Sequence, residues 1–230
     1  MAAALECTVS VRFFEVYGGK AYDLLAGGAR CAVQESAKGE VIRLCVGCAV
    51  CNPLVQVVVV GLTECPAENS EMVSGLIDVG LASRKTGCTS ANAESSRSHS
   101  LFEVSLQKNG KVKSKMTLVD LAGSERGADR GECDARTRQE GAEINKSLLA
   151  LKECVRALYS GQNQHVPFRG SRLTHIMRDA FVGAGSHTIV VACVSPAANS
   201  AEHTLNTLRY ASRIKEKTNT GEEPCCRSCR

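Results

Sequence analysis

Residues 117–125 read Thr-Leu-Val-Asp-Leu-Ala-Gly-Ser-Glu and place Asp120 at the carboxyl end of an apolar strand, expected over Lys115–Leu121. Ligands of α/β sheets bind beyond the carboxyl ends of strands. A carboxylate at that position can hold Mg²⁺, usually through water. Three residues further on, Gly123 can bring a bare backbone N–H close to a terminal phosphate. Taken alone, Asp-x-x-Gly is equally a common turn after a strand.

A hydroxyl-rich segment, Asn92-Ala-Glu-Ser-Ser-Arg-Ser-His99, lies upstream of this strand. Clustered hydroxyls on a loop can coordinate Mg²⁺ or hold an attacking water. By itself the segment could also be a solvated polar loop or a phosphorylation segment. Phe102, Val104 and Leu106 alternate with polar residues behind it, and Asn109–Gly110 predicts a hairpin turn because both residues accept positive φ.

Working outward, hydrophobic periodicity predicts strands and helices that alternate through the second half of the chain, which favours an α/β sheet with helices on its faces. The helix over Glu68–Ala82 is expected to begin at a cap formed by Asn69 or Ser70. The other expected elements are strands at Val9–Phe13, Leu54–Val60 and Thr188–Val194, the last two buried, and helices at Arg138–Tyr159, from Ser171 to Gly183, and at Ser200–Lys215.

Composition excludes several classes of protein. The 230 residues are 43% hydrophobic and 23% charged, which is typical of a globular chain. A net charge of +4 is too small to indicate a nucleic-acid or membrane partner, and 4% aromatic residues without Trp argue against a base-stacking surface. The apolar stretch Leu44–Leu62 contains Asn52, Pro53 and Gln56, so it is a poor membrane span. Thirteen cysteines without a secretory leader favour a reduced, intracellular protein.

The ordered set of motifs is far more specific than any one of them. Asn92–His99, the hairpin, Leu118–Glu125 and Glu143-Ile-Asn-Lys-Ser-Leu-Leu149 together resemble the kinesin motor domain, and the resemblance runs from about Val11 to Glu216. It implies a P-loop NTPase-like α/β fold with a mixed central sheet flanked by helices. We therefore expect a partial motor domain over 1–217 and a disordered, cysteine-containing tail over 218–230. Further matching motifs are Phe14–Tyr17, Thr89–Asn92, Pro167–Thr174 and Asn206–Ala211.

The resemblance also implies roles for residues around a bound ATP and Mg²⁺. Asn92–His99 corresponds to switch I, in which Ser95, Ser96 and Ser98 approach the metal, the γ-phosphate and the lytic water. Asp120–Glu125 corresponds to switch II, in which Asp120 holds Mg²⁺ through water and Gly123 senses the γ-phosphate. An Arg97–Glu125 ion pair closes the site, so that catalysis is mostly positioning. Asn145 couples the following helix to the switches.

The same resemblance assigns a microtubule-binding surface to the helix at 138–159 and the segment after it. The acidic surface of tubulin suits a basic stripe, although charge alone would equally fit a solvated helix face. Lys152-Glu153-Cys154, within the stretch Gly141–Cys154, resembles a motif of the internal-motor kinesins that depolymerise microtubules; processive cargo walking is the alternative. The expected contacts are Lys146, Lys152, Glu153, Cys154, Arg156, Arg169, Arg172 and Arg178, and the expected location is the microtubule cytoskeleton of the cytoplasm.

One part of the family pattern is missing. The 230 residues contain no Gly-x-x-x-x-Gly-Lys-Ser/Thr, the loop whose backbone and lysine hold the β- and γ-phosphates. We therefore expect an N-terminally truncated motor fold with bared sheet edges and apolar faces, which by itself neither binds ATP tightly nor hydrolyses it. The chain could thus be part of an ATPase motor, or a non-catalytic microtubule-binding module.

A third possibility is a cysteine-ligated metal protein. Residues 41–53 form an insert that the family pattern lacks, and Cys45, Cys48 and Cys51 in it have a spacing that iron–sulfur ligands use. A fourth ligand would have to come from Cys65 or from Cys225, Cys226 or Cys229 in the tail. Zinc would favour two paired Cys-x-x-Cys units, so inert thiols are the simpler interpretation.

Overall fold

The structure is a computed structural model, which describes residues 7–36, 56–86, 96–123, 135–159, 166–183 and 186–218. These residues fall into two compact units. One, the sheet unit, contains residues up to 34, 59–123 and 139–144; the other, the helical unit, contains residues 35–58, 124–138 and 145–230.

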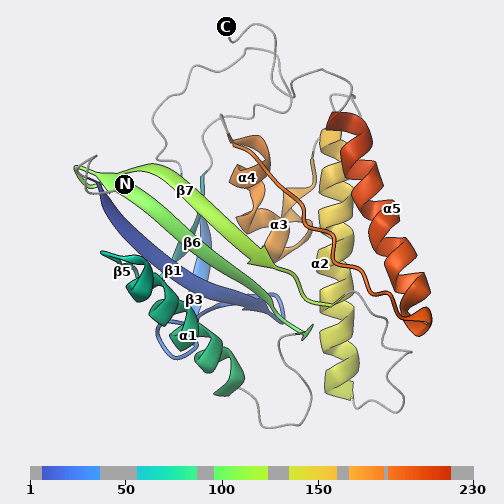
Figure 1. The fold of residues 1–230 in the computed structure, drawn as a ribbon, viewed down its shortest axis with the longest axis horizontal. Helices are drawn as coiled ribbons and strands as arrows, with labels where there is room; N and C mark the ends of the chain where they lie inside the picture. The colour runs from blue at the N-terminus through green and yellow to red at the C-terminus, as the bar shows by residue number, and fades with distance from the viewer. Residues whose placement is uncertain are drawn as a thin grey trace, which may run out of the picture. The chain divides into compact units, whose positions relative to one another are not determined.

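The chain forms a seven-stranded sheet with the order β4-β3-β2-β1-β6-β7 and β5 paired to β1 (Figure 1), and all of it belongs to the first unit except the end of β3 and the start of β4. The pairs β1–β2, β1–β5, β1–β6, β2–β3 and β6–β7 are antiparallel. The strands expected at Val9–Phe13 and on both sides of Asn109–Gly110 are confirmed. The strand expected at Leu54–Val60 is confirmed over its described residues 56–60, but its expected burial is wrong, because Val60 is 44% exposed. The bounds are β1 Thr8–Tyr17, β2 Lys20–Asp23, β3 Ala29–Ser36, β4 Gln56–Val60, β5 Cys65–Pro66, β6 His99–Lys108 and β7 Lys111–Asp120.

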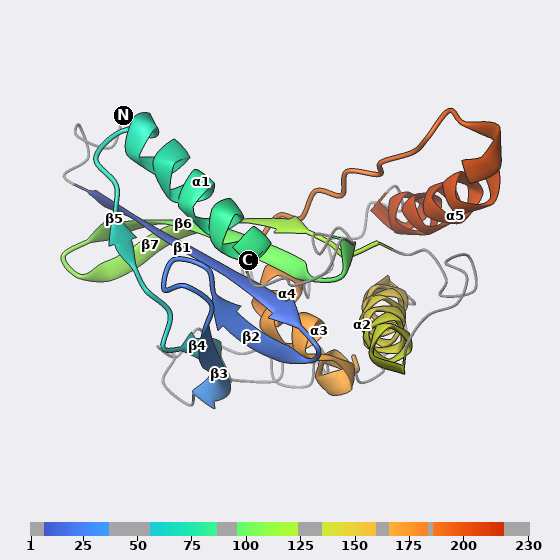
Figure 2. The same ribbon diagram turned by 90° about the horizontal axis from the view of Figure 1, so that it is seen from below.

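Helix α1 (Ser70–Thr86) lies along one face of this sheet (Figure 2). Asn69 caps it as expected, because its Oδ1 accepts the N–H of Met72 at 2.8 Å. The core beneath it contains Val11, Phe13 and Phe102, and the two phenyl rings meet edge to face at 5.4 Å. Gly80 permits the close approach of the helix, since a Cβ there would lie 2.1 Å from Cδ1 of Phe13.

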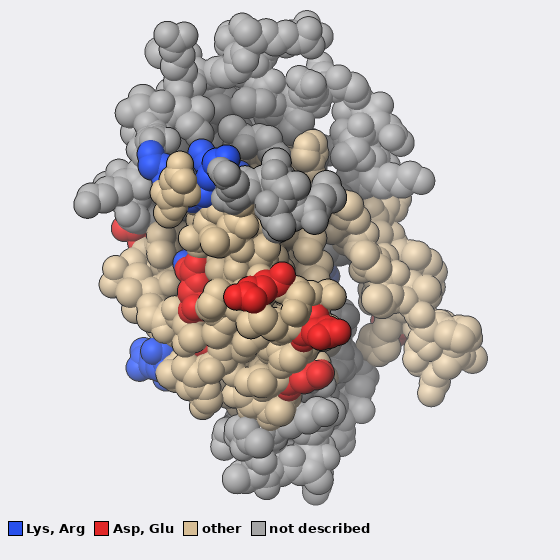
Figure 3. All heavy atoms as spheres, turned by 60° about the vertical axis from the view of Figure 1, so that its left-hand side comes forward, with Lys and Arg blue, Asp and Glu red and all other residues tan. Residues whose placement is uncertain are grey.

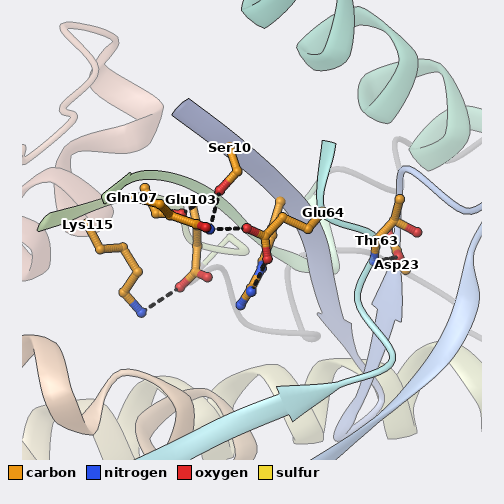
Figure 4. A network of polar contacts seen from close by, with 9 residues as sticks. Ser10, Asp23, Thr63, Glu64, Glu103, Gln107 and Lys115 are labelled. Carbon is orange, nitrogen blue, oxygen red and sulfur yellow. Dashed lines mark hydrogen bonds and ion pairs between the residues drawn. The ribbon is translucent and has the colours of Figure 1, made fainter. Parts of the chain in front are cut away.

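The other face of β1 and β6 carries polar side chains (Figure 4). Ser10 Oγ and Ser105 Oγ are 2.9 Å apart, and Gln107 Nε2 donates to Ser10 Oγ at 3.0 Å. Arg12 and Gln107 both donate to Glu64. These bonds link β1, β6 and the segment before β5, so they help to fix the register of the strands.

The hairpin between β6 and β7 has the predicted turn, with φ of 53° at Asn109 and 70° at Gly110. β7 is the last strand in the order of the described sheet. Its apolar residues Val112, Met116 and Leu118 are 54%, 56% and 54% exposed. The expectation of a bared sheet edge therefore fits this strand.

The helical unit contains most of α2 (Ala135–Tyr159), followed by η4 (Phe168–Gly170), α3 (Arg172–Ile176), α4 (Arg178–Val182), η5 (Ala198–Ser200) and α5 (Ala201–Thr218). Cys154, Val166 and Phe168 form its core. Ser171 caps α3 with a full capping box, as expected from the sequence. The single helix expected up to Gly183 is instead broken at Met177, whose ψ of −2° ends α3 before α4 begins.

The expectation of a buried strand at Thr188–Val194 is wrong for this structure. The segment pairs with no strand among the described residues, and Ile189 and Val191 are 87% and 82% exposed. Its β-branched residues suit a strand locally, but burial depends on partner strands that local sequence does not supply. Of the helices described, none is both long and apolar enough to cross a membrane.

Candidate functional site

The two motif segments identified in the sequence meet where β6 begins and β7 ends. The N–H of Gly123 donates to the carbonyl oxygen of Ser96 at 2.9 Å. Strand pairing dictates this meeting, because Ser100 lies opposite Asp120 in the β6–β7 register. The convergence that the motifs predict is therefore present, and its first link is a backbone hydrogen bond.

His99 reinforces the same junction from the start of β6. Its Nδ1 accepts the N–H of Ala122 at 3.0 Å, and the residue is 3% exposed. Burial, together with the nearby positive charge of Arg84, lowers the pKa of His99 to about 4. The imidazole is thus neutral at pH 7, which the acceptor role of Nδ1 requires.

Arg84, in the last turn of α1, is the functional residue that sequence reasoning missed. Its side chain is 6% exposed and donates to Ser98 Oγ at 3.1 Å, to Ser98 O at 2.8 Å and to Ser100 Oγ at 3.3 Å. The same guanidinium lies 3.0 Å from Asp120 Oδ2. Arg84 therefore ties the hydroxyl-rich segment to the acid of the second motif. A basic residue at a helix end next to a polar loop was the only signal in the sequence.

The residues at this junction suit Mg²⁺ by the chemistry of their donors. Asp120 offers a carboxylate that is 66% exposed, and Ser96 offers a hydroxyl on the adjacent segment. Oxygen donors with room for water are what Mg²⁺ prefers. Ser98 is 1% exposed and held by Arg84, so its hydroxyl is less accessible than expected.

Arg97 forms an ion pair with Glu140 of α2 at 2.9 Å, and both side chains are largely buried, at 13% and 12% exposed. Tyr17 also donates to Glu140. Residues 139–144 of α2 belong to the same unit as the sheet, so this contact links that part of α2 to the hydroxyl-rich segment. Asn145, the expected coupling residue, is exposed. The expected partner Glu125 lies outside the described residues.

The residues expected to bind microtubules differ in their exposure to solvent. Lys146, Lys152, Arg156, Arg169 and Arg172 are exposed, and Arg178 is half-buried. Glu153 pairs with Arg156 at 3.1 Å along the helix. Cys154 is fully buried, and burial raises its pKa to about 11. That position contradicts the expected surface contact for Cys154, because an apolar core residue of α2 cannot touch a partner directly.

A carboxylate from the end of β3, a guanidinium from η4 and an imidazole from α3 gather in the helical unit. Arg169 donates to Glu35 through Nε at 2.8 Å and Nη2 at 2.6 Å, and His175 Nε2 lies 2.8 Å from the same carboxylate. These contacts lower the pKa of Glu35 to about 2, with the hydrogen bond from Arg169 as the largest cause. No pattern in the sequence pairs residues so far apart.

Some predicted site residues fall elsewhere. Asn92, Ser95 and the cysteine-rich insert at 41–53 lie outside the described residues, as does the tail. Within the described part of the chain, no three or more His, Cys, Asp or Glu side chains gather where they could hold a metal ion together.

Comparison with known proteins agrees with this geometry. The model of the kinesin motor domain family matches residues 2–217. The chain belongs to the kinesin motor domain family. It is 47% identical over 213 residues to the kinesin-like protein KIN-13B of Arabidopsis thaliana, covering 89% of this chain and 28% of that protein. It therefore spans less than a third of the length of that relative.

A solved structure supports the kinesin fold directly. A crystal structure of mutants that reveal a signalling pathway for activation of the kinesin motor ATPase superposes with a TM-score of 0.67 at 29% identity. The match covers 90% of this chain and 57% of that one. The α/β kinesin motor fold is thus established for the described residues.

Proposed function

We propose that this chain supplies the switch segments and the microtubule-binding helix of a kinesin motor of the depolymerising class. The observation that carries the proposal is the hydrogen bond between Gly123 and Ser96, since it joins the two segments that respond to nucleotide in this family. Similarity to a KIN-13 protein and the Lys152-Glu153-Cys154 motif favour depolymerisation over cargo walking.

The nucleotide-facing residues have separate tasks. Ser96 and Asp120 would hold Mg²⁺, and the ATP bound with it supplies the phosphoryl group whose hydrolysis drives the motor. The N–H of Gly123 points across the junction, and in this structure it donates a hydrogen bond to the carbonyl oxygen of Ser96. Arg84 and His99 hold the ends of β6 and β7 in register around that bond. Both residues would position the switch segments, and correct positioning supplies much of the rate enhancement in phosphoryl transfer.

Docking on a microtubule would use the exposed basic residues of α2 and the segment after it. Lys146, Lys152 and Arg156 are exposed on α2, and Arg172 is exposed on α3. Positive side chains at these sites complement an acidic filament and speed encounter with it. By contrast, the face with α1 gathers acidic side chains (Figure 3), so it does not suit an acidic partner.

A second function is favoured by the missing phosphate cradle. The 230 residues contain no Gly-x-x-x-x-Gly-Lys-Ser/Thr, so the switches alone hold only the outer end of ATP. The chain by itself would then be a non-catalytic microtubule-binding module located on cytoplasmic microtubules.

A pelleting assay with taxol-stabilised microtubules, with and without ATP, tests both functions. We expect the chain to co-sediment and its affinity to be insensitive to ATP, with no micromolar ATP binding in a separate titration. Strong ATP dependence or micromolar ATP affinity would favour the complete motor activity in this chain. Failure to co-sediment at low salt would reject microtubule binding. Zinc and iron analysis of the same preparation tests the cysteine–metal alternative.

A further inference from the structure

The cluster of Arg169, His175 and Glu35 has the geometry of an occupied carboxylate-binding site. Arg169 places two parallel N–H groups on the two oxygens of Glu35, at 2.8 and 2.6 Å, and His175 contacts one of them at 2.8 Å. Bidentate guanidinium–carboxylate pairing is the strongest common form of this contact. One carboxylate thus receives three donors from two neighbouring elements.

The cluster is accessible from solvent. The Arg169 side chain is 75% exposed, whereas Glu35 is 27% and His175 is 14% exposed. The pKa of Glu35 near 2 shows that its ionised form is strongly preferred beside Arg169. Because the Arg169 side chain is exposed, a carboxylate from outside the chain could form the same bidentate pair with it, so that exchange would replace one strong contact with an equivalent one.

We propose that Arg169 and His175 form a carboxylate-binding site that Glu35 occupies in the free chain and that an acidic side chain of the partner filament takes over on docking. The proposal rests on the microtubule-binding function proposed above. It adds that Glu35 competes with the filament for Arg169 and His175. Two consequences follow. Glu35 weakens docking, and Arg169 contributes to docking only after its bond to Glu35 has exchanged.

Exposed basic side chains elsewhere in the helical unit favour an acidic partner at the proposed carboxylate-binding site. Arg172 is exposed three residues further along the chain, and α2 exposes Lys146, Lys152 and Arg156 in the same unit. An acidic partner that pairs with Arg169 would be attracted by the same net positive charge of these exposed side chains.

The test compares Glu35→Gln with Glu68→Gln in the full chain. Both substitutions raise the net charge by one, but Glu68 is an exposed residue of the sheet unit, just before α1, whereas the cluster belongs to the helical unit. Binding is measured to a soluble poly-L-glutamate peptide and, separately, to microtubules. Circular dichroism verifies that each variant is folded.

We expect Glu35→Gln to bind both probes about twofold to fivefold more tightly than Glu68→Gln, the range expected for release of an exposed ion pair. The gain from Glu35→Gln should disappear when Arg169 is absent, so the double variant Glu35→Gln/Arg169→Ala should bind no more tightly than Arg169→Ala alone. A gain for the peptide but no microtubule binding by any variant supports the carboxylate site and rejects the microtubule function. Equal or weaker binding of both probes by Glu35→Gln overturns the proposal.

Discussion

Replacing Arg84 with alanine tests the junction between the two switch segments. The substitution removes three hydrogen bonds to neutral acceptors, on Ser98 and Ser100, and the ion pairs with Asp120 and, at 3.8 Å, with Glu15. The guanidinium donor is charged, so each of these bonds contributes at least about 1 kcal/mol and their loss costs at least about 3 kcal/mol. The Asp120 side chain is 66% exposed, so its ion pair adds less than about 1 kcal/mol. We expect the free energy of unfolding to fall by about 3–4 kcal/mol.

Urea unfolding followed by circular dichroism measures this change, and amide exchange at Gly123 reports on the junction itself. Arg12→Ala is the matched control, because Arg12 also forms an ion pair with a carboxylate in the sheet unit, that of Glu64, but its side chain is 33% exposed. Its loss should be below about 1 kcal/mol. If Arg84→Ala is no less stable than Arg12→Ala, or if Gly123 exchanges no faster, Arg84 does not hold the junction.

Three further outcomes follow from packing and ionisation. Gly80→Ala should destabilise the chain by about 1–3 kcal/mol, measured in urea, because the added methyl collides with Phe13; unchanged stability contradicts the close packing. The pKa of His99 is about 4 in the folded chain, below its usual value of 6.5. Between these pH values the unfolded chain therefore binds more protons than the folded chain. The free energy of unfolding should thus fall by about 3 kcal/mol as the pH drops from 7 to 4. His99→Gln should flatten that dependence, and an unchanged slope would assign it to other groups. Cys154 should resist iodoacetamide at pH 7.5 while exposed Cys193 reacts, as peptide mass spectrometry can measure; rapid alkylation of Cys154 would contradict its burial.

The features that were predicted correctly from the sequence are mostly local. Asn109–Gly110 specifies its turn through its own backbone preferences, and Ser171 caps α3 through a hydroxyl three residues from its target. The meeting of Ser96 and Gly123 is long-range, but it follows from a hairpin that brings the flanking segments together. The order of the motifs along the chain is therefore enough to locate the junction.

The features that escaped prediction depend on distant partners. Arg84 reaches Asp120 across 36 positions, and buried arginines are indistinguishable in sequence from solvated ones. Glu35 meets Arg169 across 134 positions, with no periodicity to indicate it. Thr188–Val194 has a strand composition, yet strand burial requires a neighbouring strand that its own residues cannot encode.

The hydrogen bond between Gly123 and Ser96 can be observed directly by NMR. Scalar coupling across it, between the ¹⁵N of Gly123 and the ¹³C′ of Ser96, is measurable in the deuterated 24.5 kDa chain. We predict a cross-peak joining these two residues, alongside those of the β1–β6 pairs. If the β1–β6 couplings are seen but none links Gly123 to Ser96, the switch segments do not meet as described.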